Sequence, residues 1–135
     1  MLLMYQVIEL LNSFSLFNDT ETRYGVLYME NKKVKLSECC KSISDGDHLP
    51  PPKSQSGVPF ITISNIDGDN QINFNGTMFV PDSYYDSLSE EKKARIGDIL
   101  YSVVGSFGKP VFIDFDKRFV FQRHIAILKP NDKVN

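Results

Sequence analysis

Large apolar residues recur in the first 17 positions at intervals of four and three, namely Leu3, Val7, Leu10, Phe14 and Phe17. This spacing is the seam of an amphipathic helix. We expect such a helix either to pack against its own domain or to dock on a partner. The stretch is shorter than the roughly 20 residues that cross a bilayer, lacks a basic start and contains Glu9, so it indicates neither a membrane span nor a secretion signal.

Short extended segments follow. Residues 23–29 and 34–36 read as two strands joined by a turn. Ser37 is suited to cap a short helix over residues 37–43. In that helix two side chains would face inward, Cys40 and Ile43.

Residues 44–57 contain two glycines, three consecutive prolines and several small polar side chains. We expect a long loop there, and loops of this length inside a compact domain are often functional. Buried strands are predicted at residues 58–66 and 72–80, with a turn at 67–71 between them and an interruption at Gly76.

A helix or helical turn is predicted over residues 83–96, starting at Asp82 or Ser83. A strand follows at residues 96–106.

The last part of the chain reads as a hairpin of residues 109–115 and 118–129 about Asp116 and Lys117. Alternation then puts Phe119, Phe121, Arg123 and Ile125 on one face and Val120, Gln122, His124 and Ala126 on the other. The inventory predicts an α+β fold: a strand-rich mixed sheet with a few short helices and long loops.

Composition and charge add one piece of information. With 135 residues, 41% hydrophobic and 24% charged, the chain has the ordinary make-up of one globular domain. Its net charge of −2 does not indicate a nucleic-acid partner. Residues 1–90, however, carry 6 basic and 12 acidic side chains, whereas residues 91–135 carry 9 basic and 5 acidic ones. This asymmetry indicates either a basic face or ordinary scatter.

The cysteine and histidine content argues against metal or disulfide chemistry. Cys39 and Cys40 are neighbours, which cannot form a disulfide framework, and there are two histidines. We expect reduced thiols in a cytoplasmic chain, no zinc site and no cofactor.

The glycine loop before Lys109 does not match a nucleotide-binding loop. A Walker loop has four residues between its glycines and a Ser or Thr after its lysine. Here two residues separate Gly105 from Gly108, and Pro110 follows the lysine. A tight turn between strands is the better interpretation.

No enzymatic interpretation is supported, because the candidate catalytic side chains lack the second group that each would need. Asp114 and Asp116 share a strand face and could hold a metal ion as in a nuclease. The lysine of a nuclease would lie on that same face, whereas Lys117 follows Asp116 directly and points to the opposite face. His48 has no nucleophile associated with it. We therefore expect a protein without catalytic activity.

Five segments in order resemble the target-recognition domain of the specificity (S) subunit of type I restriction-modification enzymes. They are VKLSECCKSISDGDHLPPP (34–52), GVPFITISNI (57–66), TMFVPDSYY (77–85), IGDILYSVVGSFGKPVFI (96–113) and FVFQRHIAILKP (119–130). The resemblance divides the chain into residues 1–31, which it leaves unassigned, and a partial recognition domain at residues 32–135.

The resemblance implies an α+β domain that reads one half of a split DNA target and has no active site. The partners it implies are double-stranded DNA, the modification (methyltransferase) and restriction subunits, and a second recognition half, since an S subunit has two recognition domains. The alternative is a truncated or silent cassette, a remnant that folds but acts only through protein interactions.

Polar side chains on loops of a rigid sheet are what base reading requires. The candidate DNA-binding residues are Lys53, Ser54, Gln55, Asn65, Ser102, Ser106, Lys109 and Arg123. Lys53 and Gln55 rank first among the loop residues and Lys109 next, while Arg123 is the best basic candidate on a strand. Tyr84 and Tyr85 are candidates for stacking or packing.

Overall fold

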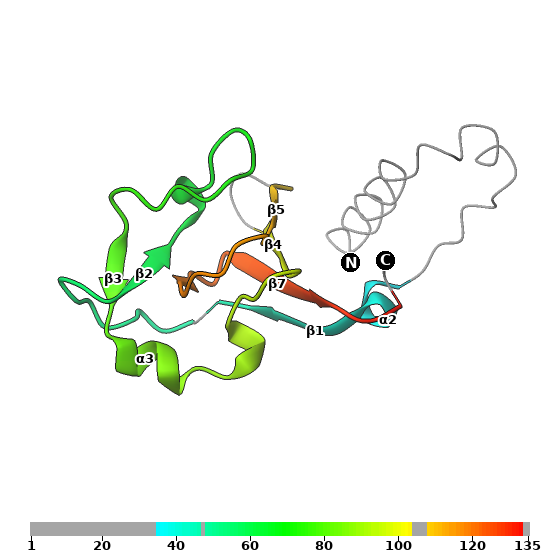
Figure 1. Cartoon of the computed structure of the whole chain (residues 1–135), viewed down its shortest axis with the longest axis horizontal. Helices are drawn as coiled ribbons and strands as arrows, with labels where there is room; N and C mark the ends of the chain where they lie inside the picture. Colours follow the sequence, from blue (N-terminus) through cyan, green and yellow to red (C-terminus); the bar gives the residue numbers. More distant parts are fainter. Residues whose placement is uncertain (1–34, 47, 104–107, 134–135) are drawn as a thin grey trace, which may run out of the picture.

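The computed structural model describes residues 35–46, 48–103 and 108–133. Its elements are α2 (Leu36–Cys39), β1 (Cys40–Asp45), β2 (Val58–Ile61), η2 (Ile63–Asn65), β3 (Met78–Val80), α3 (Asp82–Ser87), η3 (Glu90–Lys92), β4 (Ile99–Ser102), β5 (Pro110–Phe112), β6 (Val120–Phe121) and β7 (Ile125–Pro130) (Figure 1). The helices α2 and α3 are one or two turns long.

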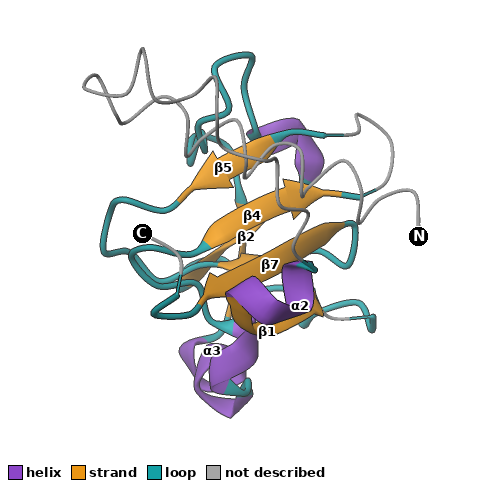
Figure 2. Ribbon diagram, turned by 90° about the vertical axis from the view of Figure 1, so that its right-hand side faces the viewer, coloured by secondary structure: helices purple, strands orange, loops and turns teal. Residues whose placement is uncertain are grey.

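Two sheets organise the described part of the chain. The first is antiparallel, with the strand order β1-β7-β4-β5, and Figure 2 shows its four strands side by side. The second has the order β3-β2-β6, in which β2 and β3 are antiparallel and β2 and β6 are parallel. The predicted α+β fold with mixed strand pairing is confirmed.

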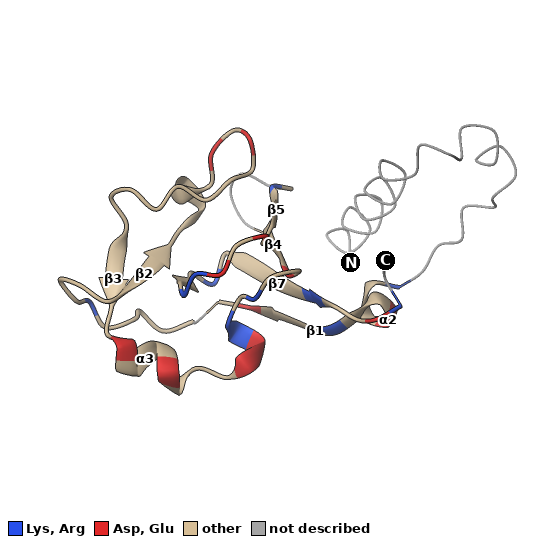
Figure 3. Cartoon of the chain, in the orientation of Figure 1, with Lys and Arg blue, Asp and Glu red and all other residues tan. Residues whose placement is uncertain are grey.

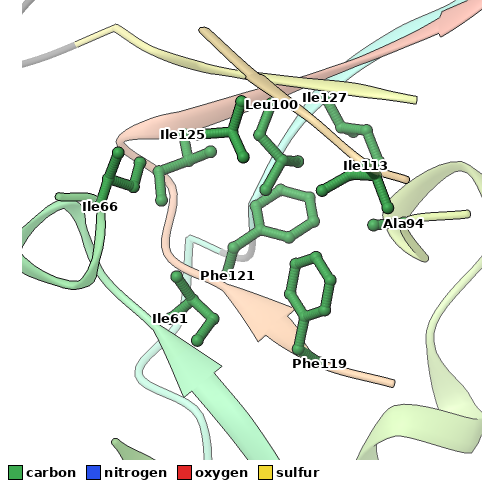
Figure 4. Packing of buried hydrophobic residues seen from close by; sticks show 10 residues of the cluster. Ile61, Ile66, Ala94, Leu100, Ile113, Phe119, Phe121, Ile125 and Ile127 are labelled. Carbon is green, nitrogen blue, oxygen red and sulfur yellow. The ribbon is translucent and has the colours of Figure 1, made fainter. Parts of the chain in front are cut away.

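The main core lies between the two sheets (Figure 4). The four-stranded sheet and its extensions contribute Leu100, Val111, Ile113, Ile125 and Ile127, and the opposite side contributes Ile61, Phe119 and Phe121. Alternation of side chains along β4 explains the choice, since Leu100 belongs to this core whereas its neighbour Tyr101 packs on the other face, in a separate cluster with Leu36 and Leu128. Each large side chain buried here stabilises the fold by about 1.5–3 kcal/mol.

A second cluster covers the other face of the three-stranded sheet. Helix α3 places Tyr85 against four strand residues, namely Val58, Phe60, Val80 and Val120. Its first turn carries Asp82, which suits the positive end of the helix dipole. The predicted start of this helix is confirmed.

The predicted helix at 37–43 is correct only in its first half. The helix begins at Leu36, after Lys35, and no side chain caps it, so the predicted cap at Ser37 is wrong. From Cys40 the chain is extended and pairs with β7. Ile43 is 41% exposed rather than inward-facing, because strand geometry turns it to the sheet surface.

Several other elements agree with the sequence. Strands β2, β3 and β4 lie within the predicted strands at 58–66, 72–80 and 96–106, although each is shorter. An isolated bridge joins Ile66 and Ile72 across the predicted turn. The helix predicted in the first 17 residues and the strand at 23–29 lie outside the described residues.

The predicted C-terminal hairpin is wrong. β5 pairs with β4, β6 pairs with β2, and β7 lies between β1 and β4. A turn, closed by the Ile125 amide donating to the Gln122 carbonyl (3.0 Å), separates β6 from β7 and breaks the predicted alternation. Phe119, Phe121 and Ile125 share the core, whereas Arg123 is exposed at the turn.

Candidate nucleic-acid interface

Three connections meet at one end of the four-stranded sheet. The amide of Gly46, just after β1, donates to the Ile125 carbonyl (3.2 Å). The amide of Val103, just after β4, donates to the His124 carbonyl (2.9 Å). Lys109 Nζ lies 3.4 Å from the Ile66 carbonyl, which follows η2. We call these positions, together with Arg123, the loop cluster.

Gly46 sets how closely the first two connections approach. A Cβ on this residue would lie 2.3 Å from the Phe121 carbonyl oxygen and 2.4 Å from Gln122 backbone atoms. Contacts that short do not occur, so the close approach of the two backbones depends on glycine. The start of the proline loop is thereby fixed against the turn that carries Arg123.

Lys53, Ser54 and Gln55 belong to a different part of the molecule. The Ser54 amide donates to the Phe79 carbonyl (2.9 Å), which adds Ser54 to the edge of β3. Lys53 and Gln55, on either side of it, are exposed. The two highest-ranked loop candidates therefore lie at the outer edge of the three-stranded sheet, apart from the loop cluster.

An apolar groove of about 180 Å³ runs beside Lys53. The proline loop forms one wall and the strands β2 and β3 form the other: Pro50, Pro51, Pro52, Lys53, Phe60, Met78, Phe79 and Val80. The prolines stiffen the loop because each fixes its own φ angle. Lys53 is thus displayed from a rigid support rather than from a free loop.

Two candidates have structural duties. The Asn65 Oδ1 accepts hydrogen bonds from the Thr62 amide (2.9 Å) and hydroxyl (3.0 Å), closing a capping box. Ser102 is completely buried, and its Oγ accepts the Lys109 amide (3.0 Å). Ser102 therefore cannot contact DNA in this conformation, and we leave it out of the interface. Ser106 lies outside the described residues.

Lys109 and Arg123 supply positive charge to the loop cluster. Arg123 is exposed, and its Nε lies 3.4 Å from His124 Nε2. Lys109 is half-buried and holds the Ile66 carbonyl by one long contact. A guanidinium has five donors and an ammonium has three, so each side chain retains donors for an anion.

Carboxylates neutralise several other cations of the C-terminal part. Arg118 lies 2.7 Å from Asp82 and 4.0 Å from Asp86 of α3. Lys129 pairs with Asp98 in a nearly buried bridge. In Figure 3, α3 carries acidic positions without basic ones, whereas the short helical segment that follows it carries both. Arg118 and Lys129 therefore add no uncompensated positive charge to a basic face built from residues 91–135.

Glu90 binds two cations at once. Its carboxylate accepts hydrogen bonds from Arg95 (2.9 Å) and Lys93 (3.2 Å). These bonds, the one from Arg95 first, hold the pKa of Glu90 below its usual value, and the same Glu90 bond raises the pKa of Arg95. Arg95 and Lys93 are consequently engaged at the protein surface.

Tyr85 is a packing residue. It is buried in the second core cluster, with Lys93 Nζ 5.2 Å and Arg118 Cζ 5.5 Å from its ring centre. Tyr84 is half-buried against the same cluster. Of the two roles considered for these tyrosines, packing is the one seen for Tyr85.

One cation–π contact in this part of the molecule has no signal in the sequence, whereas one side-chain pair does have such a signal. Lys117 Nζ lies 3.8 Å from the centre of the Phe74 ring, so its cation–π partner comes from 43 positions earlier in the chain. His48 Nε2 lies 2.8 Å from Asp45 Oδ2 at the start of the proline loop. The i,i+3 spacing of Asp45 and His48 was a usable signal, whereas no local pattern pairs Lys117 with Phe74.

Within the described ranges, no group of three or more His, Cys, Asp or Glu side chains is arranged to hold a metal ion. A search of the same ranges for a helix long and apolar enough to cross a membrane found none.

Comparisons with known proteins identify a shared fold. No family model matches the chain, and a search of curated proteins gives no match. Among solved structures, the fold is similar to the HsdS subunit from Thermoanaerobacter tengcongensis, with a TM-score of 0.51 and 23% identity over 76% of this chain. It is also similar to a chain from a structure of a type I restriction-modification system described for its complex assembly and conformational transition, with a TM-score of 0.54 and 20% identity over 94% of this chain.

The class of fold is thus the α+β fold of type I restriction-modification specificity subunits, and the resemblance seen in five sequence segments agrees with it. The chain spans only 24% and 30% of the two matched chains. At these identities the likeness concerns the fold.

Proposed function

We propose that this chain is a non-catalytic, sequence-specific DNA-binding module of a type I restriction-modification specificity subunit. In this role residues 32–135 read one half of a split target and direct the modification and restriction subunits to it. The observation that carries the proposal is the fold shared with HsdS, found independently of the five sequence segments. Free thiols and such partners fit a cytoplasmic location.

The proposed contacts divide by chemistry. Arg123 and Lys109 of the loop cluster bind phosphate, because they are cations with donors to spare on closely packed backbone. Lys53 and Gln55 at the β3 edge read bases, since a glutamine amide pairs bidentately with adenine and a lysine with guanine. Asn65 contributes by holding the η2 turn that positions the Ile66 carbonyl.

The experiment compares two exposed arginines. Arg123→Ala should weaken binding of the full chain to pooled random duplexes by about 1–2 kcal/mol, because an unpaired cation meets the phosphates. Arg118→Ala is the matched control, since Arg118 is already held by Asp82. Fluorescence anisotropy at low salt measures both. Equal losses for the two variants would refute the proposed interface.

The two residues proposed to contact bases, Gln55 and Lys53, are tested by a different measurement. Gln55→Ala should leave binding to random duplexes nearly unchanged but relax the sequence preference in a selection from a random pool, because base contacts carry specificity. Lys53→Ala should also relax the sequence preference, and it should weaken binding to random duplexes as well, because a lysine that does not meet its guanine still neutralises phosphate. A selected sequence that is unaltered by both substitutions would contradict their assignment.

One observation favours a second candidate function. Three acidic residues from the first 90 positions, Asp82, Asp86 and Glu90, hold cations of the C-terminal part. A remnant domain that acts only through protein interactions would have no reason to keep a basic face. Absence of DNA binding by a folded chain at low salt would select this alternative.

A further inference from the structure

The outer face of the four-stranded sheet, turned away from the main core, is lined by apolar side chains. One cross-strand row passes over all four strands as register partners: Ile43, Leu128, Ile99 and Phe112. The neighbouring row is Asp45, Ala126, Tyr101 and Pro110. Apart from Asp45, none of these eight side chains carries a charge. Along β4, β5 and β7 these residues alternate with the residues of the main core. They therefore lie on the opposite, largely apolar face of the sheet.

Helix α2 covers a small part of this face. Leu36 packs against Tyr101 and Leu128, which are nearly fully buried. Among the described residues, Leu36 is the one member of that cluster contributed by a helix. Figure 2 shows α2 over β7 and β1, whereas β4 and β5 extend beyond it. At the ends of the row Ile43 is 41% and Phe112 is 53% exposed.

An apolar sheet face normally packs against a second layer. The segment η3 does not provide it, because the Lys129 ammonium and the Ser44 hydroxyl, which reach η3 and its flank, project from the opposite face. The described helices therefore leave the two ends of the row, at Ile43 and Phe112, exposed to solvent.

The chain carries a matching apolar surface directly before α2. Residues 3–17 have the seam of apolar side chains described above, and 34 residues precede Lys35. A helix formed by residues 3–17 would be about 22 Å long. The four strands are about 14 Å wide between the outer axes, so one such helix is long enough to cross them all.

The point at which the N-terminal segment joins the described fold favours this segment, rather than a second copy of the chain, as the layer that covers the outer face. The polypeptide enters the described fold at Lys35, and the next residue, Leu36, already packs on the outer face. The sequence from residue 18 to residue 34 is long enough, when extended, to span more than the width of the sheet. Tethering beside the face gives this segment an effective concentration that a second copy reaches only at millimolar concentration.

We propose that the apolar seam of residues 3–17 docks across the outer face of the four-stranded sheet in the same chain, forming a third layer of the fold. Leu10 and Phe14 lie in the middle of the seam, facing the row from Ile43 to Phe112. The inference is independent of DNA binding.

Photocrosslinking tests this docking in the full chain. A benzoylphenylalanine replaces Phe112, whose exposed ring tolerates the larger group. Equal amounts of unlabelled and ¹⁵N-labelled protein are mixed, irradiated and digested. We expect adducts between residue 112 and peptides from residues 1–31, with both peptides from one isotopic form. The same group at Met78, on the edge of the other sheet, should give no such adduct.

Two variants show whether the seam makes the contact. Leu10→Asp should lower the adduct yield at least about fivefold, since a buried charge is strongly disfavoured. Asn12→Asp, on the opposite side of the same predicted helix, should leave the yield unchanged. Adducts of mixed isotopic form would mean that a second copy covers the face. Those adducts, or no adduct with residues 1–31, would overturn the proposal.

Discussion

Gly46 joins the proline loop to the turn before β7, and a single methyl group should disturb this junction. Gly46→Ala places a Cβ 2.3 Å from the Phe121 carbonyl oxygen, so the backbones must separate. We expect a loss of about 2–3 kcal/mol in the free energy of unfolding, as in overpacked cores. Urea unfolding followed by circular dichroism measures it.

The control for this prediction is Gly68→Ala. A Cβ there meets no atom within 4 Å, so its stability should stay within about 0.5 kcal/mol of the parent. A Gly46→Ala protein as stable as the control would mean that the two backbones are less closely packed than the structure has them.

Cys40 is a second residue whose chemistry depends on its surroundings. Burial, and to a lesser degree the neighbouring Cys39, raises the pKa of the Cys40 thiol from its usual value of 9.0 to about 11. Because the thiolate is the reactive form, iodoacetamide at pH 8.5 should alkylate Cys40 at least about tenfold more slowly in the folded than in the urea-unfolded chain. Mass spectrometry of the peptide that contains both cysteines measures this. Equal rates in the two states would contradict the burial argument.

The same pKa shift predicts a direction for stability against pH. Above pH 9 the unfolded thiol loses its proton while the folded thiol keeps it, so stability falls as the pH rises from about 9 towards 11. Cys40→Ser removes this contribution. A variant and a parent with parallel stability profiles across that window would show that Cys40 is not its source.

At the scale of elements, the sequence predicted strands better than their partners. The apolar stretches at 58–66 and 96–106 contain β2 and β4, because a short apolar run bounded by turn residues is a local signal of a buried strand. Pairing is not written locally: β7 lies between β1 and β4, which are far apart in the chain. The predicted hairpin about Asp116 failed for this reason.

The predicted helix at 37–43 is wrong in its second half, because local and distant preferences compete there. Cys, Ser and Ile are weak helix formers, and the pairing of Ser42 and Ile43 with β7 overrides the second half of the predicted helix. The candidate site behaved similarly. Exposure of Lys53, Gln55 and Arg123 was inferable from polarity, whereas burial of Ser102 depends on a sheet that assembles from distant segments.

One polar bridge attaches η3 and its flank to the four-stranded sheet. Lys129 of β7 donates to Asp98 and to the Lys93 carbonyl (2.7 Å), and Asp98 accepts the Arg95 amide (2.7 Å). Lys129→Met leaves Asp98 nearly buried without its cation. We expect a loss of about 3 kcal/mol, because breaking such a pair strands a charge. Urea unfolding measures the loss, and amide exchange should rise locally in residues 90–95.

The exposed Arg95–Glu90 pair provides the matched control. Arg95→Gln should change stability little, because water and salt screen exposed ion pairs. The pair Lys129→Met with Asp98→Leu should recover part of the loss of the single variant, since neither charge is then stranded. A Lys129→Met protein with the stability of Arg95→Gln would show that the bridge is not what holds this segment.

For the whole molecule, charge separates the two proposed functions. The net charge of −2 and the ion-paired cations leave a few exposed or half-buried basic side chains for DNA, among them Lys53, Lys109, Lys117 and Arg123. Binding should therefore be weak and depend on counterion release from few phosphates. A protein-interaction remnant needs none of these cations.

The salt dependence of binding tests this count. If those four side chains contact phosphate, the logarithm of the association constant falls with the logarithm of salt concentration with a slope of about −3.6. Raising salt from about 50 to about 200 mM then weakens binding about 150-fold, which anisotropy of the full chain resolves. Replacing Lys53, Lys109 and Arg123 together by alanine should reduce the slope to about −1, because one phosphate contact remains. An unchanged slope in that triple variant would mean that other cations of the molecule make the phosphate contacts. A slope near zero in the parent would mean that the chain meets its partners through protein surfaces instead.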